Sequence, residues 1–230
     1  MDKILLMLEL QATLNEATNG AKWTDGITKN AKVINWKRCI YMECAEMIDS
    51  FSWKHWKNID KEADWANLQI EVVDVWHFIM SLAIENYAQN SKGSINELGH
   101  ALLKVENFEK IVLKNTLFAD ENEIMEKIEA IMLESLLKKE FHLEKLVNDF
   151  FDLVVMSGLD LETLYKLYVG KNILNQFRQD HGYKDGSYIK VWNGEEDNVV
   201  MQRVLEQNSD IAPAKLYEEL EKLYPAQNKN

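Results

Sequence analysis

The sequence predicts an all-α protein. Only two prolines occur in the 230 residues, Pro213 and Pro225, so about 210 residues run without the commonest helix breaker. Apolar residues recur at helical spacing in several stretches, and residues typical of helix caps precede them. The chain is 47% hydrophobic and long enough for one sizeable core, and a single domain over residues 1–230 is the simplest organisation.

The first predicted helices are set by their cap residues and stop signals. One runs from Asp2 to about Thr18 and ends at the turn formers Asn19 and Gly20. A second begins near Asn35, a good N-cap, and continues to about Phe51. A third covers about residues 64–87.

The later helices follow the same signals. Ser94 and Glu97 have the spacing of a capping box that opens a fourth helix, and Asp120 opens a fifth in a similar way. Further helices are expected over residues 142–156, 160–179, 195–207 and 213–223, with an ordered loop over residues 182–198. Residues 88–158 carry no motif and form a candidate helical insert.

Composition excludes several classes of protein. The formal charge of −12 argues against a nucleic-acid-binding surface, because phosphate backbones are bound by clustered Lys and Arg. No apolar stretch reaches the roughly 18 residues of a membrane span, and the N-terminus lacks the features of a signal peptide. We therefore expect a soluble, cytoplasmic protein. Cys39 and Cys44 are too few and too awkwardly spaced for a disulfide framework or a zinc site, so we expect buried thiols.

Two helices carry acids in unusually apolar surroundings. Between Ile70 and Met80 the only polar residues are Glu71, Asp74 and His77, spaced three apart. A helix that is apolar nearly all round is buried, so this stripe should face the interior. The segment from Arg38 to Phe51 repeats the pattern with acids at the following positions: Glu43, Glu46 and Asp49.

Buried carboxylates of this kind favour a metal site. Two carboxylates about 5 Å apart repel each other by ~3 kcal/mol at an effective dielectric constant of about 20. Oxygen ligands without cysteine and with little histidine suit Mg²⁺, or Mn²⁺ as a substitute, better than zinc. The alternative is that Lys37, Arg38 or shared protons neutralise the acids.

A second region suits an anionic ligand. Residues 166–190 contain five basic residues against two acids, in a chain that is otherwise strongly acidic. Glycine and tyrosine interleave with these charges, a composition typical of a loop that closes on phosphates. A solvated basic loop is the simpler interpretation when the segment is taken alone. Beside a Mg²⁺ cluster, a polyphosphate ligand is favoured.

These residues carry a family resemblance. The pattern Glu43-x-x-Glu46 followed by Glu71-x-x-Asp74 resembles the metal motif of the all-α nucleoside triphosphate pyrophosphatases. More narrowly, the chain resembles the dimeric dUTPases through several blocks that occur in the same order, namely residues 10–15, 52–57, 170–178, 182–186 and 192–198. The carboxylate motif alone is moderately specific, whereas the ordered blocks are strongly specific.

The resemblance implies hydrolysis of dUTP to dUMP and pyrophosphate, and of dUDP to dUMP, by a Mg²⁺-dependent helical homodimer that keeps uracil out of DNA. Glu43, Glu46, Glu71 and Asp74 match the metal ligands, and we expect Glu46 also to orient or deprotonate the attacking water. The remaining matched or adjoining residues are expected to bind the substrate: Gln11 and Asn15 at the uracil, Trp53 and Lys57 in the site wall, His77 and Phe78 beside the deoxyribose, and Lys171, Asn175, Arg178, Tyr183, Lys184 and Lys190 at the phosphates and sugar.

Three rival functions stay open at this stage. The first is a pyrophosphatase of the same superfamily with broader base specificity. The second is a di-iron helical protein, since Asp74-x-x-His77 and Glu97-x-x-His100 faintly resemble the Glu-x-x-His pairs of such bundles. Glu97 is better explained by its capping box, and di-iron chemistry gives no reason for the basic segment. The third is a helical interaction module without catalytic activity.

Overall fold

The structure is a computed structural model that describes residues 3–57, 62–90, 93–113, 118–208 and 211–225. Helices make up most of these ranges, and strands occur there only in one short hairpin, so the prediction of an all-α protein is confirmed. No helix in the described ranges is long and apolar enough to cross a membrane. Contacts divide the chain into two compact units, residues 1–165 and 166–230, and the single domain over residues 1–230 stays a prediction.

The first two helices begin as their sequences indicate. Helix α1 (Lys3–Asn19) matches the first predicted helix, whose expected start, Asp2, lies outside the described residues. Helix α2 (Trp36–Asp49) begins after Asn35, whose side chain accepts a hydrogen bond from the backbone N–H of Arg38. This cap satisfies one of the donors that a helix start leaves open.

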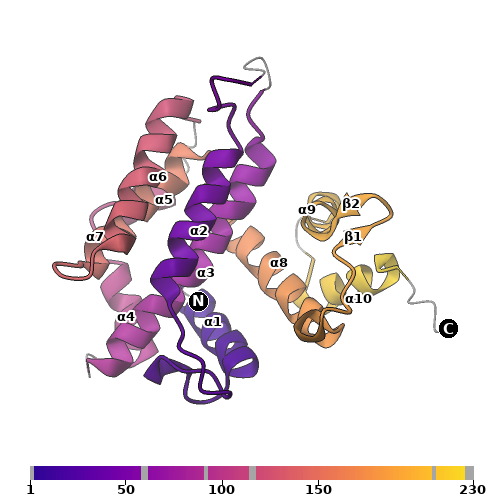
Figure 1. Ribbon diagram of the computed structural model, residues 1–230, viewed down its shortest axis with the longest axis horizontal. Helices are drawn as coiled ribbons and strands as arrows, with labels where there is room; N and C mark the ends of the chain where they lie inside the picture. The colour runs from indigo at the N-terminus through magenta and orange to yellow at the C-terminus, as the bar shows by residue number, and fades with distance from the viewer. Residues whose placement is uncertain (1–2, 58–61, 91–92, 114–117, 209–210, 226–230) are drawn as a thin grey trace. The chain divides into compact units, whose positions relative to one another are not determined.

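Helix α3 (Trp65–Gln89) is the central helix of the first unit. It begins after Asp64, whose carboxylate accepts a hydrogen bond from the backbone N–H of Asn67. Most of its side chains are buried, because α1 and α2 both pack against it. Figure 1 shows α2 and α3 lying side by side along much of their length. The two helices that carry the acid motifs are therefore direct neighbours.

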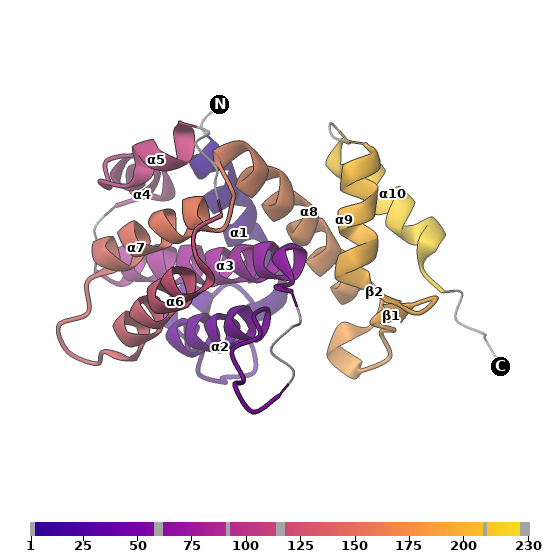
Figure 2. The same cartoon turned by 90° about the horizontal axis from the view of Figure 1, so that it is seen from above.

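The segment expected as an insert, residues 88–158, contributes to the core of the first unit. Its described part forms α4 (Ile95–Leu102), α5 (Phe108–Val112), α6 (Glu121–Leu136) and α7 (Leu143–Met156). Helix α6 packs on α2, and α7 packs on both α6 and α3 (Figure 2). The ring of Trp76 on α3 stacks on Phe150 of α7, with ring centres 4.9 Å apart and planes 6° from parallel. Both side chains are fully buried.

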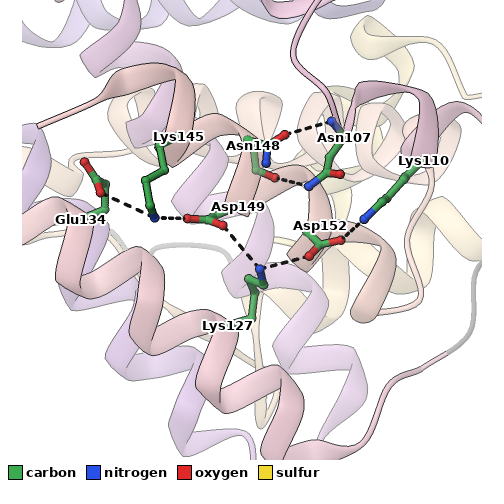
Figure 3. A network of polar contacts seen from close by, with 8 residues as sticks. All are labelled: Asn107, Lys110, Lys127, Glu134, Lys145, Asn148, Asp149 and Asp152. Carbon is green, nitrogen blue, oxygen red and sulfur yellow. Dashed lines mark hydrogen bonds and ion pairs between the residues drawn. The ribbon is translucent and has the colours of Figure 1, made fainter.

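A row of alternating charges joins α5, α6 and α7 (Figure 3). In order, the row consists of Lys110, Asp152, Lys127, Asp149, Lys145 and Glu134. The nitrogen to oxygen distances between neighbours run from 2.6 Å to 3.6 Å. Most of these side chains are partly exposed, whereas Glu134 is buried, and ion pairs that water can reach contribute at most about 1 kcal/mol each. Their main effect is to fix how these three helices lie along one another.

Lys37 ties the start of α2 to the end of α6. Its Nζ donates a hydrogen bond to the backbone oxygen of Leu137 at 2.9 Å and lies 3.5 Å from the centre of the Phe141 ring. A cation at a helix C-terminus and a cation over an aromatic face are both favourable. Burial lowers the pKa of Lys37, against the raising effect of the Glu134 charge. The segment expected as an insert therefore supports one of the two acid-bearing helices.

The second unit starts within α8 (Leu161–Asp180). It continues through η2 (Tyr183–Asp185), β1 (Val191–Trp192), β2 (Glu195–Glu196), α9 (Asp197–Gln207) and α10 (Pro213–Leu223). Strands β1 and β2 pair antiparallel, with Trp192 opposite Glu195. The ordered loop expected over residues 182–198 thus contains a small hairpin and the start of α9.

Two features hold the second unit together. The buried ring of Phe177 on α8 contacts the rings of Trp192 and Tyr224, with centres 5.6 Å and 5.3 Å away. Gly170 allows α9 to approach α8 closely, because a Cβ at this position would lie 2.6 Å from a methyl carbon of Leu205 and 2.8 Å from the sulfur of Met201. Any side chain here would have to displace these two side chains of α9.

Phe150→Ala tests whether the segment over residues 88–158 belongs to the core. Removing this buried ring leaves a cavity against Trp76, so we expect the free energy of unfolding to fall by about 3–5 kcal/mol. The measurement is urea denaturation followed by circular dichroism. Leu133→Ala on the exposed face of α6 is the control, and its effect should stay within about 0.5 kcal/mol. A loss below about 1 kcal/mol for Phe150→Ala would show that α7 is not part of the core.

Candidate active site

Three acids from α2 and α3 form a carboxylate cluster. Glu43 and Glu46 lie one turn apart on α2, Glu71 lies on α3, and one carboxylate oxygen from each falls within 4.8 Å of the other two. Glu71 is buried, Glu43 is half-buried and Glu46 is exposed. The cluster therefore runs from the interior to the surface, where a solute can reach it.

Asp74, the fourth predicted ligand, is not part of this close group. It lies one turn beyond Glu71 on α3 and is half-buried. The structure thus brings together three of the four acids predicted to bind metal. The ligand role of all four acids stays a prediction.

The cations considered as alternative partners of the acids make contacts elsewhere. Lys37 contacts the end of α6, and the Nε of Arg38 donates a hydrogen bond to the hydroxyl of Tyr41 at 3.3 Å. Burial and the negative charge of Glu43 both raise the pKa of Cys44, which is a buried thiol as expected, while Cys39 is half-buried. Lys37 and Arg38 thus both have partners other than the acids of the cluster.

Asp49 has a structural role that separates it from the cluster. Its carboxylate accepts hydrogen bonds from the Trp53 indole N–H at 2.9 Å and from Lys54 Nζ at 2.6 Å. These contacts lower the pKa of Asp49. They also fix the segment after α2, in which Trp53 and Lys57 are both exposed. The predicted place of these two residues in the site wall stays a prediction.

A second group of predicted residues forms a buried polar network between α1 and α3. His77 Nδ1 and Gln11 Oε1 are 2.6 Å apart, and Gln11 Nε2 donates to Asn15 Oδ1 at 3.2 Å. Both amides also donate to the hydroxyl of Ser81, from Gln11 at 3.0 Å and from Asn15 at 2.9 Å. All four side chains are buried. The face of α1 that carries Gln11 and Asn15 is therefore a buried contact with α3.

Two further side chains of α3 border this network. Phe78, predicted to lie beside the deoxyribose, is half-buried and stacks on Trp36 with ring centres 6.2 Å apart. Two turns further on, burial raises the pKa of Glu85 to about 7, against the lowering effect of Trp36. Together with Glu71, Asp74, His77 and Ser81, Glu85 completes a polar stripe along the otherwise apolar part of α3.

In the second unit, a buried ion pair organises the predicted phosphate-binding residues. Arg178 donates through Nε and Nη2 to the two carboxylate oxygens of Asp197, each at 2.8 Å, and through Nη1 to Asn175 Oδ1 at 3.2 Å. The hydroxyl of Tyr188 also donates to Asp197, which is fully buried. Burial alone would raise the pKa of Asp197, but the hydrogen bonds and charge of Arg178 outweigh it and hold that pKa below its usual value.

The other cations of this unit lie around the same ion pair or on its surface. Lys171 is buried and donates to Asn198 Oδ1 at 2.8 Å, and the Arg178 guanidinium lies 5.8 Å from the centre of the Tyr183 ring. Lys184 and Lys190 are exposed, and Lys190 lies 3.6 Å from Glu196. Lys171, Asn175, Arg178 and Tyr183 are thus brought together, whereas Lys184 and Lys190 lie outside the buried group.

Glu97 and His100, one of the two pairs that faintly resembled a di-iron motif, make local contacts within and before α4. The Glu97 carboxylate accepts hydrogen bonds from the backbone N–H and the hydroxyl of Ser94, which confirms the capping box at the start of α4. These bonds lower the pKa of Glu97. The Nδ1 of His100 is bonded to the backbone oxygen of Asn96 at 2.8 Å. Neither side chain belongs to the group of possible metal ligands found among the described residues.

Sequence reasoning missed two residues, one in each unit, that contact predicted binding residues. Ser81 extends the polar stripe of α3 by one turn, and following the stripe past Met80 would have found it. Asp197 follows Glu195 and Glu196 in a run of acids that a sequence indicates as solvated, and only its burial reveals the contact with Arg178.

Comparison with known proteins shows the family to which the chain belongs. An all-α fold that gathers carboxylates from two neighbouring helices is the arrangement expected of the helical nucleoside triphosphate pyrophosphatases. A family model described as dUTPase matches residues 3–183, and the chain belongs to this family, that of the all-α dimeric dUTPases. It is a dUTP diphosphatase. The matched range includes residues 88–158 but ends before Lys184 and Lys190. No curated protein sequence matches the chain.

Asp197→Asn tests the buried ion pair. The change leaves the Arg178 guanidinium buried without a counter-charge, so we expect the local free energy of opening of α9 to fall by about 3 kcal/mol. Hydrogen exchange of the α9 amides, followed by mass spectrometry, measures this quantity. Glu195→Gln is the control, because Glu195 pairs with Arg203 in a more exposed ion pair. It should change the local free energy of opening of α9 by at most about 1 kcal/mol.

The same pair gives a pH dependence with a definite sign. A carboxyl whose pKa is lowered by folding contributes stability above its unfolded pKa of about 3.9 and loses this contribution as the pH falls through the folded value. The wild-type protein should therefore lose stability below about pH 4 more steeply than Asp197→Asn. The free energy of unfolding of both proteins is measured by guanidinium denaturation at a series of pH values. An equally steep loss below about pH 4 in the two proteins would contradict this origin of the lowered pKa.

Proposed function

We propose that the chain hydrolyses dUTP to dUMP and pyrophosphate with Mg²⁺ held by the carboxylate cluster, and that it also converts dUDP to dUMP. Hydrolysis of dUTP follows from membership of the family. The observation that supports the Mg²⁺ requirement is the approach of Glu43, Glu46 and Glu71 to within 4.8 Å of one another.

The cluster fits a hard divalent cation in charge and in donor type. At this spacing each pair of ionised carboxylates repels by roughly 3 kcal/mol at an effective dielectric constant of about 20. A cation between them turns this cost into attraction, and carboxylate oxygens are the ligands that Mg²⁺ and Mn²⁺ prefer. Asp74, one turn away on the same face of α3, would complete the set. Bound Mg²⁺ would neutralise charge on the polyphosphate and on its leaving oxygens.

Glu46 is the acid best placed to act on the attacking water. It is the exposed member of the cluster, so its carboxylate can meet a water molecule from solvent while Glu43 and Glu71 lie deeper. A carboxylate within hydrogen-bond reach of a water molecule can orient it or take its proton. We assign this role to Glu46.

Each unit, taken by itself, carries polar groups suited to one part of the substrate. Gln11, Asn15 and His77 form a buried set of amide and imidazole groups suited to the edge of a pyrimidine base. Lys171 and Arg178 supply positive charge for phosphates, with Tyr183 beside the guanidinium. Since dUDP carries the same base, sugar and α-phosphate, the same residues would bind it.

We further propose a cytoplasmic homodimer that acts on deoxyuridine nucleotides and keeps uracil out of DNA. The free thiols of Cys39 and Cys44 suit a reducing compartment. A pyrophosphatase of broader base specificity is the alternative. The buried amides of α1 support the narrower function, because buried polar groups penalise a base that cannot pair with them.

Glu46→Gln tests the catalytic proposal. The amide keeps the size of the side chain but cannot accept a proton from water, so kcat for dUTP should fall by about 10²–10⁴-fold. The measurement is pyrophosphate release in the presence of Mg²⁺. Because Glu46 is exposed, the urea midpoint should be unchanged.

The matched control is Glu126→Gln, which removes an exposed acid from the solvated face of α6 and should leave kcat intact. If Glu46→Gln turned over dUTP within threefold of the wild-type rate, the role given to Glu46 would be wrong.

A further inference from the structure

The residue that follows α10 contacts residues 183–190, a stretch named here the 183–190 loop. We propose that Tyr224 is a positioning residue that fixes this loop for binding the polyphosphate of the substrate. The inference rests on the proposed function and on the predicted contact of Lys184 and Lys190 with the phosphates and sugar. Tyr224 lies outside residues 3–183, the range that the family model matches.

The 183–190 loop has few contacts that hold it in place. Of its residues, all of which the structure describes, only Tyr188 is not exposed. The first half of the loop is closed locally, because the backbone N–H of Ser187 donates to the backbone oxygen of Gly182 at 3.1 Å. The position of the second half depends mainly on what contacts Tyr188 and Ile189. A segment with so little buried surface is ordered by a small number of contacts.

Tyr224 contacts the second half of the loop in two ways. Its ring stacks on the ring of Tyr188, with centres 5.4 Å apart and planes 14° from parallel. Its hydroxyl oxygen accepts a hydrogen bond from the backbone N–H of Ile189 at 3.0 Å. The backbone oxygen of Ile189 accepts a second bond, from the indole N–H of Trp192 at 2.7 Å. Both polar backbone groups are thus bonded at the residue directly before Lys190.

Tyr224 can act as an anchor because it is itself fixed to the core of the second unit. Its ring contacts the rings of Phe177 and Trp192, with centres 5.3 Å and 5.2 Å away, and both of those side chains are buried. Aromatic pairs at such distances stabilise a cluster beyond the effect of burial alone. Since Phe177 belongs to α8, the anchor joins the loop to the helix that carries Lys171 and Arg178.

Tyr188 also joins the loop to the buried ion pair. Its hydroxyl donates to Asp197 at 2.8 Å, and Asp197 is the partner of Arg178. Its ring contacts the ring of Tyr183, with centres 5.8 Å apart, and Tyr183 lies beside the Arg178 guanidinium. Holding Tyr188 in place therefore sets where the lysines of the loop lie relative to Arg178.

The test compares Tyr224→Phe and Tyr224→Leu with wild type. The first change removes the hydrogen bond to Ile189 and keeps the ring, whereas the second removes both contacts. Apparent affinity falls with the fraction of molecules whose loop is in the binding arrangement. KM for dUTP should therefore rise about fivefold in Tyr224→Phe and at least about tenfold in Tyr224→Leu, with kcat within about twofold of wild type. Loss of folded protein would instead lower the apparent kcat and leave KM unchanged.

Trypsin cleavage after Lys184 and Lys190 reports on the loop without relying on turnover. Both Tyr224 variants should be cut faster at these two bonds than wild type, as measured by mass spectrometry of the first fragments. Cleavage after Lys138, which is exposed between α6 and α7, is the internal control and should not change.

Tyr217→Phe and Tyr217→Leu are the matched controls. Tyr217 lies on α10, and its ring also contacts Phe177, with centres 5.2 Å apart. Its hydroxyl also forms a hydrogen bond, which it donates to Asp180 at 2.9 Å. Because these contacts lead to α8 and not to the loop, KM and the cleavage rates should stay at their wild-type values.

An unchanged KM in both Tyr224 variants would overturn the role of Tyr224, and so would an equal rise of KM in the Tyr217 variants. The variant that combines Lys184→Gln with Lys190→Gln tests the premise separately, and its KM for dUTP should also rise. An unchanged KM in this double variant would overturn the predicted phosphate contacts of the two lysines, on which the inference rests.

Discussion

The mutual repulsion of three carboxylates held within 4.8 Å of one another is the constraint on which the candidate site depends. The helices that carry these acids must be held rigidly, because repulsion would separate the carboxylates if either helix could move. The scaffold is the close packing of α2 on α3, supported on the outer side of α2 by α6. Lys37 fixes the start of α2 to the end of α6, and the row of charges in Figure 3 fixes α6 to α5 and α7. The segment that carries no recognisable motif therefore supports one of the two helices that carry the acids.

Local signals predicted the helices well, and their failures have physical causes. Asn35, Asp64 and Ser94 cap helices because each side chain satisfies a backbone N–H that lies within three residues, an interaction that the sequence displays directly. Strands β1 and β2 are two residues long, too short for an alternating pattern to show. The contribution of residues 88–158 to the core depends on contacts such as Trp76 with Phe150, which join positions far apart in the chain.

The site was predictable where its residues share one helix face, and much less so where the chain folds back on itself. The spacing of Glu71, Asp74 and His77 predicted an inward stripe, and the buried faces of Glu71 and His77 agree with it. Glu43 and Glu46 approach Glu71 only because α2 packs against α3. From the sequence, this approach was expected on the basis of the family resemblance. The pairing of Arg178 with Asp197 joins a helix to the end of a hairpin, and nothing in the run of acids around Asp197 distinguishes the buried one.

The central claim is that the acids of α2 and α3 form a metal site, and direct measurement of Mn²⁺ binding tests it without relying on turnover. Free Mn²⁺ gives an electron paramagnetic resonance signal that is lost on binding, so a titration gives the affinity. Wild type should bind Mn²⁺, with Mg²⁺ in competition, and Glu43→Gln combined with Glu71→Gln should weaken binding by about 100-fold or more. Glu126→Gln should bind as wild type does. Equal Mn²⁺ affinity in the wild type and the double variant would contradict the assignment.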